Sequence, residues 1–126
     1  LGQQTNEATT RGVAAMFSSW FNDIGLNTDF APVVDLRLNP GNVIGDRSYS
    51  ADPDTVVQNA YWFMDEFLNN NQITTLKHFP GHGSSEGDSH QGFTDVTNTW
   101  QEIELDPYTA LIDSGCVDMI MMAHVF

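Results

Sequence analysis

Histidine and carboxylate side chains gather in one short stretch, residues 77–90, which reads KHFPGHGSSEGDSH and holds three of the four histidines of the chain. Its proline and glycines disfavour helix and sheet, so we expect a loop. Within this loop Asp88 precedes His90 by two residues, close enough for the carboxylate to accept a hydrogen bond from one ring nitrogen. Such a bond fixes the imidazole tautomer and turns the other nitrogen outward, as a histidine general acid/base requires. A solvated pair without function is the alternative interpretation.

Metal and nucleotide chemistry fit the same stretch poorly. His78 and His82 have the spacing of a zinc-binding helix, but the Pro80-Gly81 pair between them would break that helix. We therefore predict no metal site, and a loop-based site that includes Asp88 or His90 is the alternative. The glycines match neither a dinucleotide nor a phosphate-binding pattern, and we expect no cofactor.

The composition limits the class of ligand. Four Lys and Arg residues against seventeen Asp and Glu give a net charge of -13, which disfavours binding to nucleic acid and to anionic membranes. No apolar run approaches the roughly 18 residues of a membrane span, so we expect no membrane insertion. The cations Arg47 and Lys77 and the carboxylate of Asp35 follow predicted strands or lie in loops. Such a mixture of donors and acceptors suits a sugar.

The remaining sequence predicts the elements that position these residues. Apolar residues recur at helical spacing over 6–24, and Asp52-Pro53 is a strong start for a second helix that ends at 69–71. Thr99 and Glu102 have capping-box spacing, and Asp106-Pro107 restarts or kinks a third helix that ends near Gly115. Apolar runs predict strands at 30–34, 73–76 and 116–123.

Alternating helices and strands predict an α/β fold with a parallel sheet. Each predicted strand ends in polar residues, and a barrel gathers all such ends on one face, whereas an open sheet needs them only beside its switch point. A complete barrel has eight strands in about 250 residues. We therefore predict a partial (β/α)8 TIM barrel of about three β/α units. The polar residues at the strand ends are Asp35 and Arg37 after the first strand, Lys77 and His78 after the second, and His124 after the third.

Several motifs resemble the β-N-acetylglucosaminidase (β-hexosaminidase) branch of glycoside hydrolase family 3. The defining match is KHFPGHG at 77–83 followed by DSH at 88–90. FAPVVD at 30–35, IGDRS at 44–48 and MAHV at 122–125 resemble the family's preceding strand, arginine loop and following strand, in the right order. The resemblance implies that residues 1–126 are a fragment of the family's N-terminal catalytic barrel.

The resemblance also implies roles for individual residues. His90 is then the general acid/base of a retaining mechanism with a covalent glycosyl-enzyme intermediate, and Asp88 is its partner. Family positions that hold the N-acetylglucosamine unit match Asp35, Arg47, Lys77 and His78. We expect His82 to shape the loop, His124 to line the pocket, and Arg37 to form a loop ion pair. The family's nucleophilic aspartate would lie beyond residue 126, so we expect this segment alone to be inactive.

The function implied is exo-hydrolysis of terminal β-linked N-acetylglucosamine from peptidoglycan fragments or chitooligosaccharides. The alternatives are a β-N-acetylglucosaminide phosphorylase, because a histidine acid/base does not repel phosphate, and a non-catalytic sugar-binding module. We expect the remainder of the barrel as a partner, or self-association of the isolated segment. The compartment stays open. The acidic composition and the continuation QGFTDVT at 91–97 favour a periplasmic or extracellular location over a cytoplasmic one.

Overall fold

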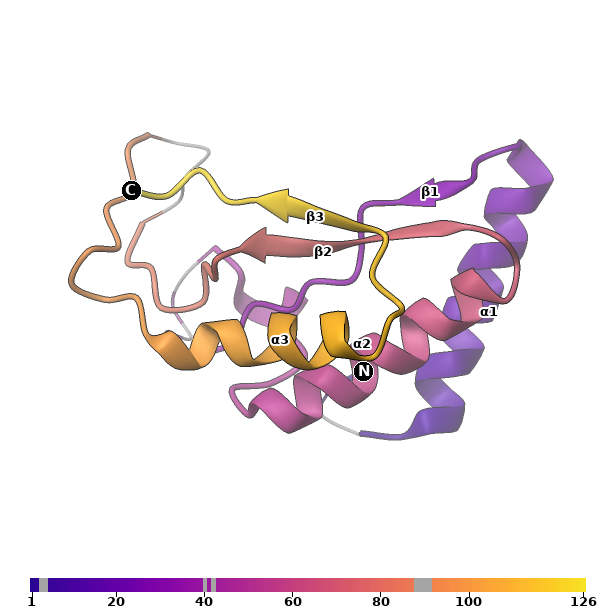
Figure 1. Ribbon diagram of the computed structural model, residues 1–126, viewed down its shortest axis with the longest axis horizontal. Coiled ribbons are helices and arrows are strands. Elements are labelled where there is room, and N and C mark those ends of the chain that lie inside the picture. Colours follow the sequence, from indigo (N-terminus) through magenta and orange to yellow (C-terminus); the bar gives the residue numbers. More distant parts are fainter. Residues whose placement is uncertain (3–4, 40, 42, 88–91) are drawn as a thin grey trace.

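The computed structural model describes residues 1–2, 5–39, 41, 43–87 and 92–126. Helices and strands alternate along the chain, and two short 3-10 helices, η1 and η2, interrupt the connections (Figure 1). None of the helices in these ranges is long and apolar enough to cross a membrane. The elements in chain order are α1 (Glu7–Ile24), β1 (Thr28–Asp29), η1 (Gly45–Arg47), α2 (Pro53–Leu68), β2 (Ile73–Phe79), η2 (Glu102–Leu105), α3 (Asp106–Asp113) and β3 (Met119–Met122).

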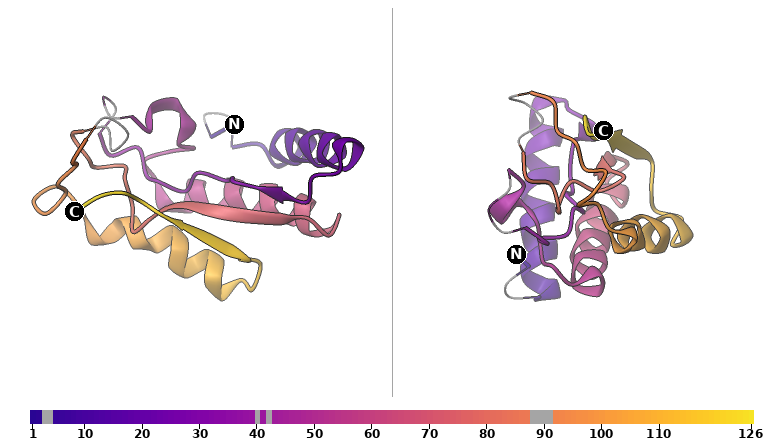
Figure 2. Two further views of the ribbon diagram at one scale, coloured as in Figure 1. Left: turned by 90° about the horizontal axis from the view of Figure 1, so that it is seen from above. Right: turned by 90° about the vertical axis from the view of Figure 1, so that its left-hand side faces the viewer.

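The strands form a parallel sheet in the order β1-β2-β3, which confirms the predicted α/β fold with a parallel sheet. The spatial order follows the chain order, as it does around a barrel. All three arrows in Figure 1 point the same way, so the carboxyl ends of the strands meet at one edge of the sheet. The helices α1, α2 and α3 lie side by side in the right-hand view of Figure 2, in contact with one another in that order.

The prediction of a strand over 30–34 is wrong in its bounds. The paired strand β1 covers Thr28–Asp29, and the following segment joins β2 through one isolated bridge between Val33 and Lys77. Pro32 has no N–H to donate to the ladder, which interrupts regular pairing. The segment still runs beside β2, because the Val34 N–H donates to the Lys77 carbonyl at 2.8 Å.

Two other boundaries differ from the prediction. The strand predicted over 116–123 is limited to β3, because Cys116 still turns against the end of α3, where its Sγ lies 2.8 Å from Ser114 Oγ. β2 is longer than predicted and includes Lys77 and His78.

The capping box is not at Thr99 and Glu102. It uses Gln101 and Glu104, because the first helical residue is Glu102 itself.

The main core lies between α2, α3 and the sheet. Helix α2 begins as predicted: Asp52 is the N-cap, its carboxylate accepts from the Thr55 N–H at 3.0 Å, and proline occupies the first turn. The apolar face of α2 then packs against the strands. The buried cluster consists of Val34, Leu36, Val56, Ala60, Met64, Leu76, Tyr108 and Leu111.

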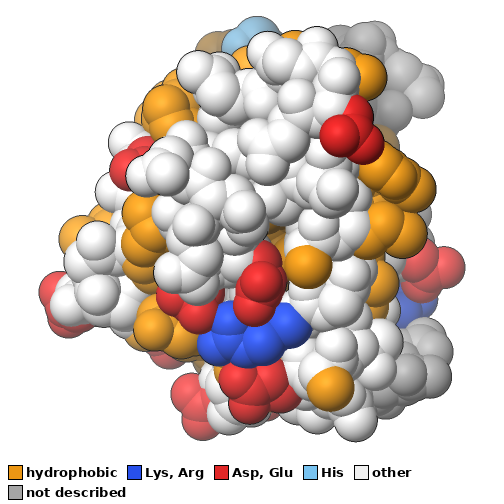
Figure 3. All heavy atoms as spheres, turned by 90° about the vertical axis from the view of Figure 1, so that its right-hand side faces the viewer, with side chains coloured by type: hydrophobic (Ala, Val, Ile, Leu, Met, Phe, Trp, Pro, Cys, Tyr) orange, Lys and Arg blue, Asp and Glu red, His pale blue; other side chains and the backbone are white. Residues whose placement is uncertain are grey.

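Helix α1 begins after its cap Asn6 and ends at Gly25, but its predicted apolar face is not the buried one. Thr10, Ala14 and Ser18 are buried, whereas Trp20 is 51% exposed and Ile24 is 70% exposed. Small side chains allow α1 to approach α2 closely, and Arg11 adds ion pairs to Asp65 and Glu66 of α2. Figure 3 shows this side of the molecule, where acidic side chains surround a basic one and apolar side chains remain at the surface.

Candidate functional site

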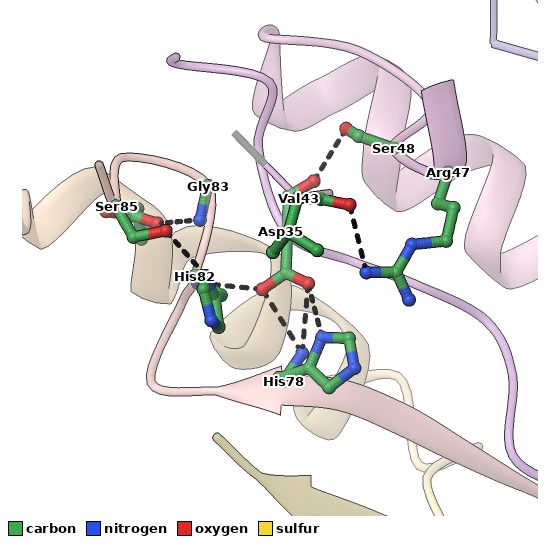
Figure 4. A network of polar contacts seen from close by, with 9 residues as sticks. Asp35, Val43, Arg47, Ser48, His78, His82, Gly83 and Ser85 are labelled. Atoms are coloured by element: carbon green, nitrogen blue, oxygen red, sulfur yellow. Dashed lines mark hydrogen bonds and ion pairs between the residues drawn. The ribbon is translucent and has the colours of Figure 1, made fainter. Parts of the chain in front are cut away.

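A buried carboxylate organises the end of β2. Asp35 is 1% exposed, and its two oxygens accept hydrogen bonds from the His78 N–H at 3.2 Å and from the His82 N–H at 2.8 Å. His78 Nδ1 lies 2.7 Å from Asp35 Oδ2 (Figure 4). The predicted site residues Asp35 and His78 therefore meet. In this arrangement the Asp35 carboxylate is packed against His78 and is almost inaccessible to solvent.

The ring of His78 is oriented by this contact. An ionised carboxylate only accepts hydrogen bonds, so Nδ1 donates and Nε2 of the neutral ring is an acceptor on the other side. The pairing of β2 with β3 shifts between Lys77 and Phe79, which places His78 at a bulge. Bulges re-aim side chains at sheet edges and next to active sites. His78 is thus held by both its backbone and its side chain.

A pocket of about 280 Å³ lies at this edge of the sheet. It brings together four of the predicted site residues, namely Arg47, His78, His124 and the loop-shaping His82. The end of β3 supplies apolar lining. The complete lining is Val43, Ile44, Arg47, His78, His82, Met121, Met122, Ala123 and His124.

Lys77 lies outside the pocket lining and is half-buried within β2. The pKa of its ammonium group is lowered, because burial disfavours the charge and the nearby positive charge of Arg47 acts in the same direction. The pKa of the neighbouring Asp29 carboxyl is raised by burial, which the charge of Lys77 partly opposes.

The arginine loop is tied to the same strand end. Ser48 Oγ donates to the Asp35 carbonyl at 2.6 Å, and the Arg47 guanidinium donates to the Val43 carbonyl at 3.2 Å. Arg37 pairs with Asp46 at 3.0 Å, which confirms the predicted loop ion pair. Arg47 itself is exposed and lines the pocket. The loop thus presents the Arg47 guanidinium to the same pocket as His78 (Figure 4).

The loop after β2 is closely packed. His82 is 3% exposed, and its Nδ1 lies 2.7 Å from Ser85 Oγ. Gly83 allows a close approach of two backbones, because a Cβ there would lie 1.6 Å from the Leu36 carbonyl oxygen. These contacts are consistent with the loop-shaping role predicted for His82. The predicted pair Asp88 and His90 lies outside the described residues.

Glu104 is part of this arrangement and was not predicted. Its carboxylate is 1% exposed and accepts from the Gly83 N–H at 2.9 Å and from the Ser84 hydroxyl. A signal was present in the sequence. Glu104 is spaced by four and seven residues from Tyr108 and Leu111, so it shares their buried face, where an acid needs hydrogen-bond partners.

We found no metal-binding arrangement among the described residues 1–2, 5–39, 41, 43–87 and 92–126. These residues contain no group of three or more His, Cys, Asp or Glu side chains that could hold a metal ion. What the described geometry offers is a pocket with apolar lining and a few polar groups, among them a fixed imidazole, a guanidinium and a second histidine. Such groups can donate to and accept from the hydroxyls and carbonyl of a neutral, polar ligand.

Comparisons with known proteins place the chain among related sequences and structures. The chain is 44% identical over 126 residues to a β-hexosaminidase of Tolumonas auensis, a match that covers 98% of this chain and 37% of the relative. A family 3 β-N-acetylglucosaminidase structure from Paenibacillus sp. strain FPU-7 superposes with a TM-score of 0.90 at 34% identity, over 99% of this chain and 24% of that one.

A second structure is NagZ of Neisseria gonorrhoeae in complex with N-trifluoroacetyl-D-glucosamine. It superposes with a TM-score of 0.83 at 31% identity, over 94% of this chain and 36% of that one. The chain thus spans little more than a third of the length of the curated relative above. The family model described as the glycosyl hydrolase family 3 N terminal domain matches residues 1–126, and the chain belongs to this family.

Proposed function

We propose that residues 1–126 form one segment of the catalytic barrel of a β-N-acetylglucosaminidase, which removes terminal β-linked N-acetylglucosamine from peptidoglycan fragments or chitooligosaccharides. The observation that carries the proposal is the pocket at the strand ends, where Asp35 fixes His78 opposite Arg47. The related NagZ structure holds an N-acylated glucosamine. The whole reaction belongs to a longer chain, because relatives of this segment are nearly three times its length.

In the proposed binding mode the pocket recognises the sugar through complementary hydrogen bonds. Arg47 donates to sugar oxygens, and Nε2 of His78 accepts from a hydroxyl. Asp35 acts indirectly, by fixing the imidazole of His78. His124 adds a donor after β3, and Lys77, which lies within β2 outside the pocket lining, adds a donor from beside it. Among the described residues that line the pocket, Arg47 is the one with a fixed charge, so the pocket suits a neutral saccharide.

The proposed chemistry uses the Asp88–His90 pair. His90 protonates the glycosidic oxygen while an aspartate from another part of the barrel attacks the anomeric carbon and forms a glycosyl-enzyme intermediate. The neutral His90 then removes a proton from water, which attacks the anomeric carbon and releases the aspartate. Asp88 holds the imidazole in the required tautomer. Without that nucleophile, residues 1–126 alone are inactive.

The test uses a full-length family member that contains this segment. It compares cleavage of an aryl β-N-acetylglucosaminide with the matching β-glucoside, for the wild type and for His90→Ala. We expect selective cleavage of the acetamido substrate and a loss of about 10²- to 10⁴-fold in the variant. Glu86→Gln is the matched control, because Glu86 is exposed in the same loop and should leave cleavage unchanged.

Other outcomes assign other functions. Binding of N-acetylglucosamine without turnover by the full-length wild type would replace the enzyme with a sugar-binding module. Faster turnover in phosphate buffer, with N-acetylglucosamine 1-phosphate as product, would replace hydrolysis by phosphorolysis. Cleavage by His90→Ala at the wild-type rate would contradict the assigned acid/base.

A further inference from the structure

The buried carboxylate of Glu104 has no part in the binding or chemistry proposed above. It accepts from the Gly83 N–H at 2.9 Å, from the Ser84 hydroxyl and from the Gln101 N–H at 3.3 Å. No ion pair to Glu104 occurs within residues 1–2, 5–39, 41, 43–87 and 92–126. Its carboxyl group is therefore held by hydrogen bonds, two of which come from the loop that follows β2.

The segment that carries Glu104 lies directly against this loop. The Trp100 indole N–H donates to the Pro80 carbonyl at 3.1 Å. Gly81 has a φ of +126°, and a Cβ at this position would lie 2.5 Å from the Cβ of Glu104. The close approach leaves no space for a side chain at Gly81. Trp100 thus holds the loop at Pro80, and Glu104 holds it at Gly83 and Ser84.

Asp35 holds the same loop through the adjacent residue. The His82 N–H donates to Asp35, and the next N–H along the chain, that of Gly83, donates to Glu104. Two buried carboxylates that are far apart in the sequence therefore accept from neighbouring peptide groups. Asp35 fixes His78 at the end of β2 and the loop at His82. Glu104 fixes the loop at Gly83 and Ser84, from which the chain leads toward residues 88–90.

We propose that Glu104 is a positioning residue for the acid/base step, an inference that rests on the proposed function. Asp35 anchors the sugar-binding His78, and Glu104 anchors Gly83 and Ser84, from which the chain continues to the acid/base pair. Loss of the Glu104 contacts then impairs proton donation to the leaving group more than it impairs sugar binding.

The test measures how the rate depends on the leaving group, in a full-length family member that contains this segment. A 2,4-dinitrophenyl β-N-acetylglucosaminide has a leaving group that departs without a proton, whereas chitobiose requires one. Glu104→Gln keeps an acceptor for Gly83 but donates toward Gln101. We expect its kcat/KM, which reports only the first step up to loss of the leaving group, to fall at least about 10-fold more on chitobiose than on the aryl substrate.

Three further variants complete the design. Glu104→Ala should lose more than Glu104→Gln on chitobiose, which makes Gln a partial rescue. Ser84→Ala removes one partner of Glu104 and should show the same selective loss to a smaller degree. Glu102→Gln is the control, because Glu102 is exposed on the same 3-10 helix. If Glu104→Ala does not fold, Glu104→Gln and Ser84→Ala still decide the question.

Equal losses of kcat/KM on both substrates would overturn the positioning role and leave a structural one. That result differs from failure of the proposed function. If the wild type cleaves neither substrate, both proposals fall. If the wild type cleaves both and the Glu104 variants keep its preference between leaving groups, only the present inference fails.

Discussion

The ends of β2 and β3 lie side by side but differ in how completely they are surrounded. At the end of β2, polar groups are paired with two buried carboxylates, and Thr75 and Leu76 are buried within the strand. In β3, by contrast, Met119 is 41% exposed, Ile120 is 38% exposed and Met122 is 61% exposed. Within the part of the chain that the structure describes, β2 is the central strand, whereas β3 pairs on one side only.

The difference teaches that the described residues enclose the end of β2 but leave β3 exposed. An apolar strand in a parallel sheet is normally covered on both faces. We therefore propose that further barrel strands pair with β3 in the longer chain, and that α1, with Trp20 and Ile24 exposed, contacts a neighbouring helix. The predictions below test this contrast.

The largest effect is expected where the β2 loop meets the backbone of Leu36. Gly83→Ala would place a Cβ within 1.6 Å of the Leu36 carbonyl oxygen, so the loop cannot keep its position. In a full-length family member we expect kcat/KM to fall by at least about 100-fold, or about 2.7 kcal/mol, together with a lower Tm.

Gly12→Ala is the matched control for that substitution. Gly12 lies within α1 with no atom near its added Cβ, so alanine should stabilise the helix by about 0.5–1 kcal/mol. A Gly83→Ala variant with wild-type Tm and activity would show that the loop is less constrained than the contacts indicate.

A smaller loss is expected for Asp35→Asn. The amide accepts through one oxygen only, so at least one donor among the His78 N–H, His78 Nδ1 and the His82 N–H loses its partner. Hydrogen bonds to charged groups contribute about 1.5–3 kcal/mol, which corresponds to a fall of about 10- to 100-fold in kcat/KM.

The companion measurement is calorimetric binding of N-acetylglucosamine, which should weaken in Asp35→Asn because His78 is no longer fixed. Asp46→Asn is the control. Asp46 is 88% exposed and pairs with Arg37 at the surface, so its loss should change kcat/KM less than about 5-fold. Equal binding by wild type and Asp35→Asn would separate Asp35 from sugar recognition.

At β3 we expect changes in association rather than in activity. The isolated 126-residue chain should self-associate through its exposed apolar strand, and Met122→Lys should raise the monomer fraction in gel filtration with light scattering. Thr109→Lys makes the same change of charge at an exposed position of α3. If both lysine variants shift the equilibrium equally, net charge and not the β3 surface controls association.

The smallest effect is a pH dependence at Lys77. Its folded-state pKa is lowered, so between that value and the ordinary value of 10.5 the unfolded chain binds more protons than the folded one. The stability contribution is therefore present above pH 10.5 and is lost as pH falls through the folded-state pKa. The Tm of the wild type minus that of Lys77→Met should rise from pH 8 to pH 10.5. A constant or falling difference would contradict the lowered pKa.

Local sequence signals were sufficient for much of the scaffold. Helix α2 begins at the predicted cap Asp52, whose side chain satisfies an N–H group of the first turn, and α1 lies within the predicted range 6–24. The restart at Asp106-Pro107 and the three-strand alternation were also predicted correctly. The polar strand ends predicted that His78 and His124 would share a site, since parallel strands bring their carboxyl ends together, and the family resemblance added Arg47.

The sequence by itself determined the elements, their parallel order and the family, because these depend on short-range periodicity, caps and motif spacing. Only the tertiary structure decided that Thr10, Ala14 and Ser18 form the buried face of α1, that Pro32 displaces the first strand, and that Glu104 holds the β2 loop. The physical reason is the same in each case. Burial and hydrogen-bond satisfaction depend on which distant segment lies opposite a residue, and no local pattern specifies that partner.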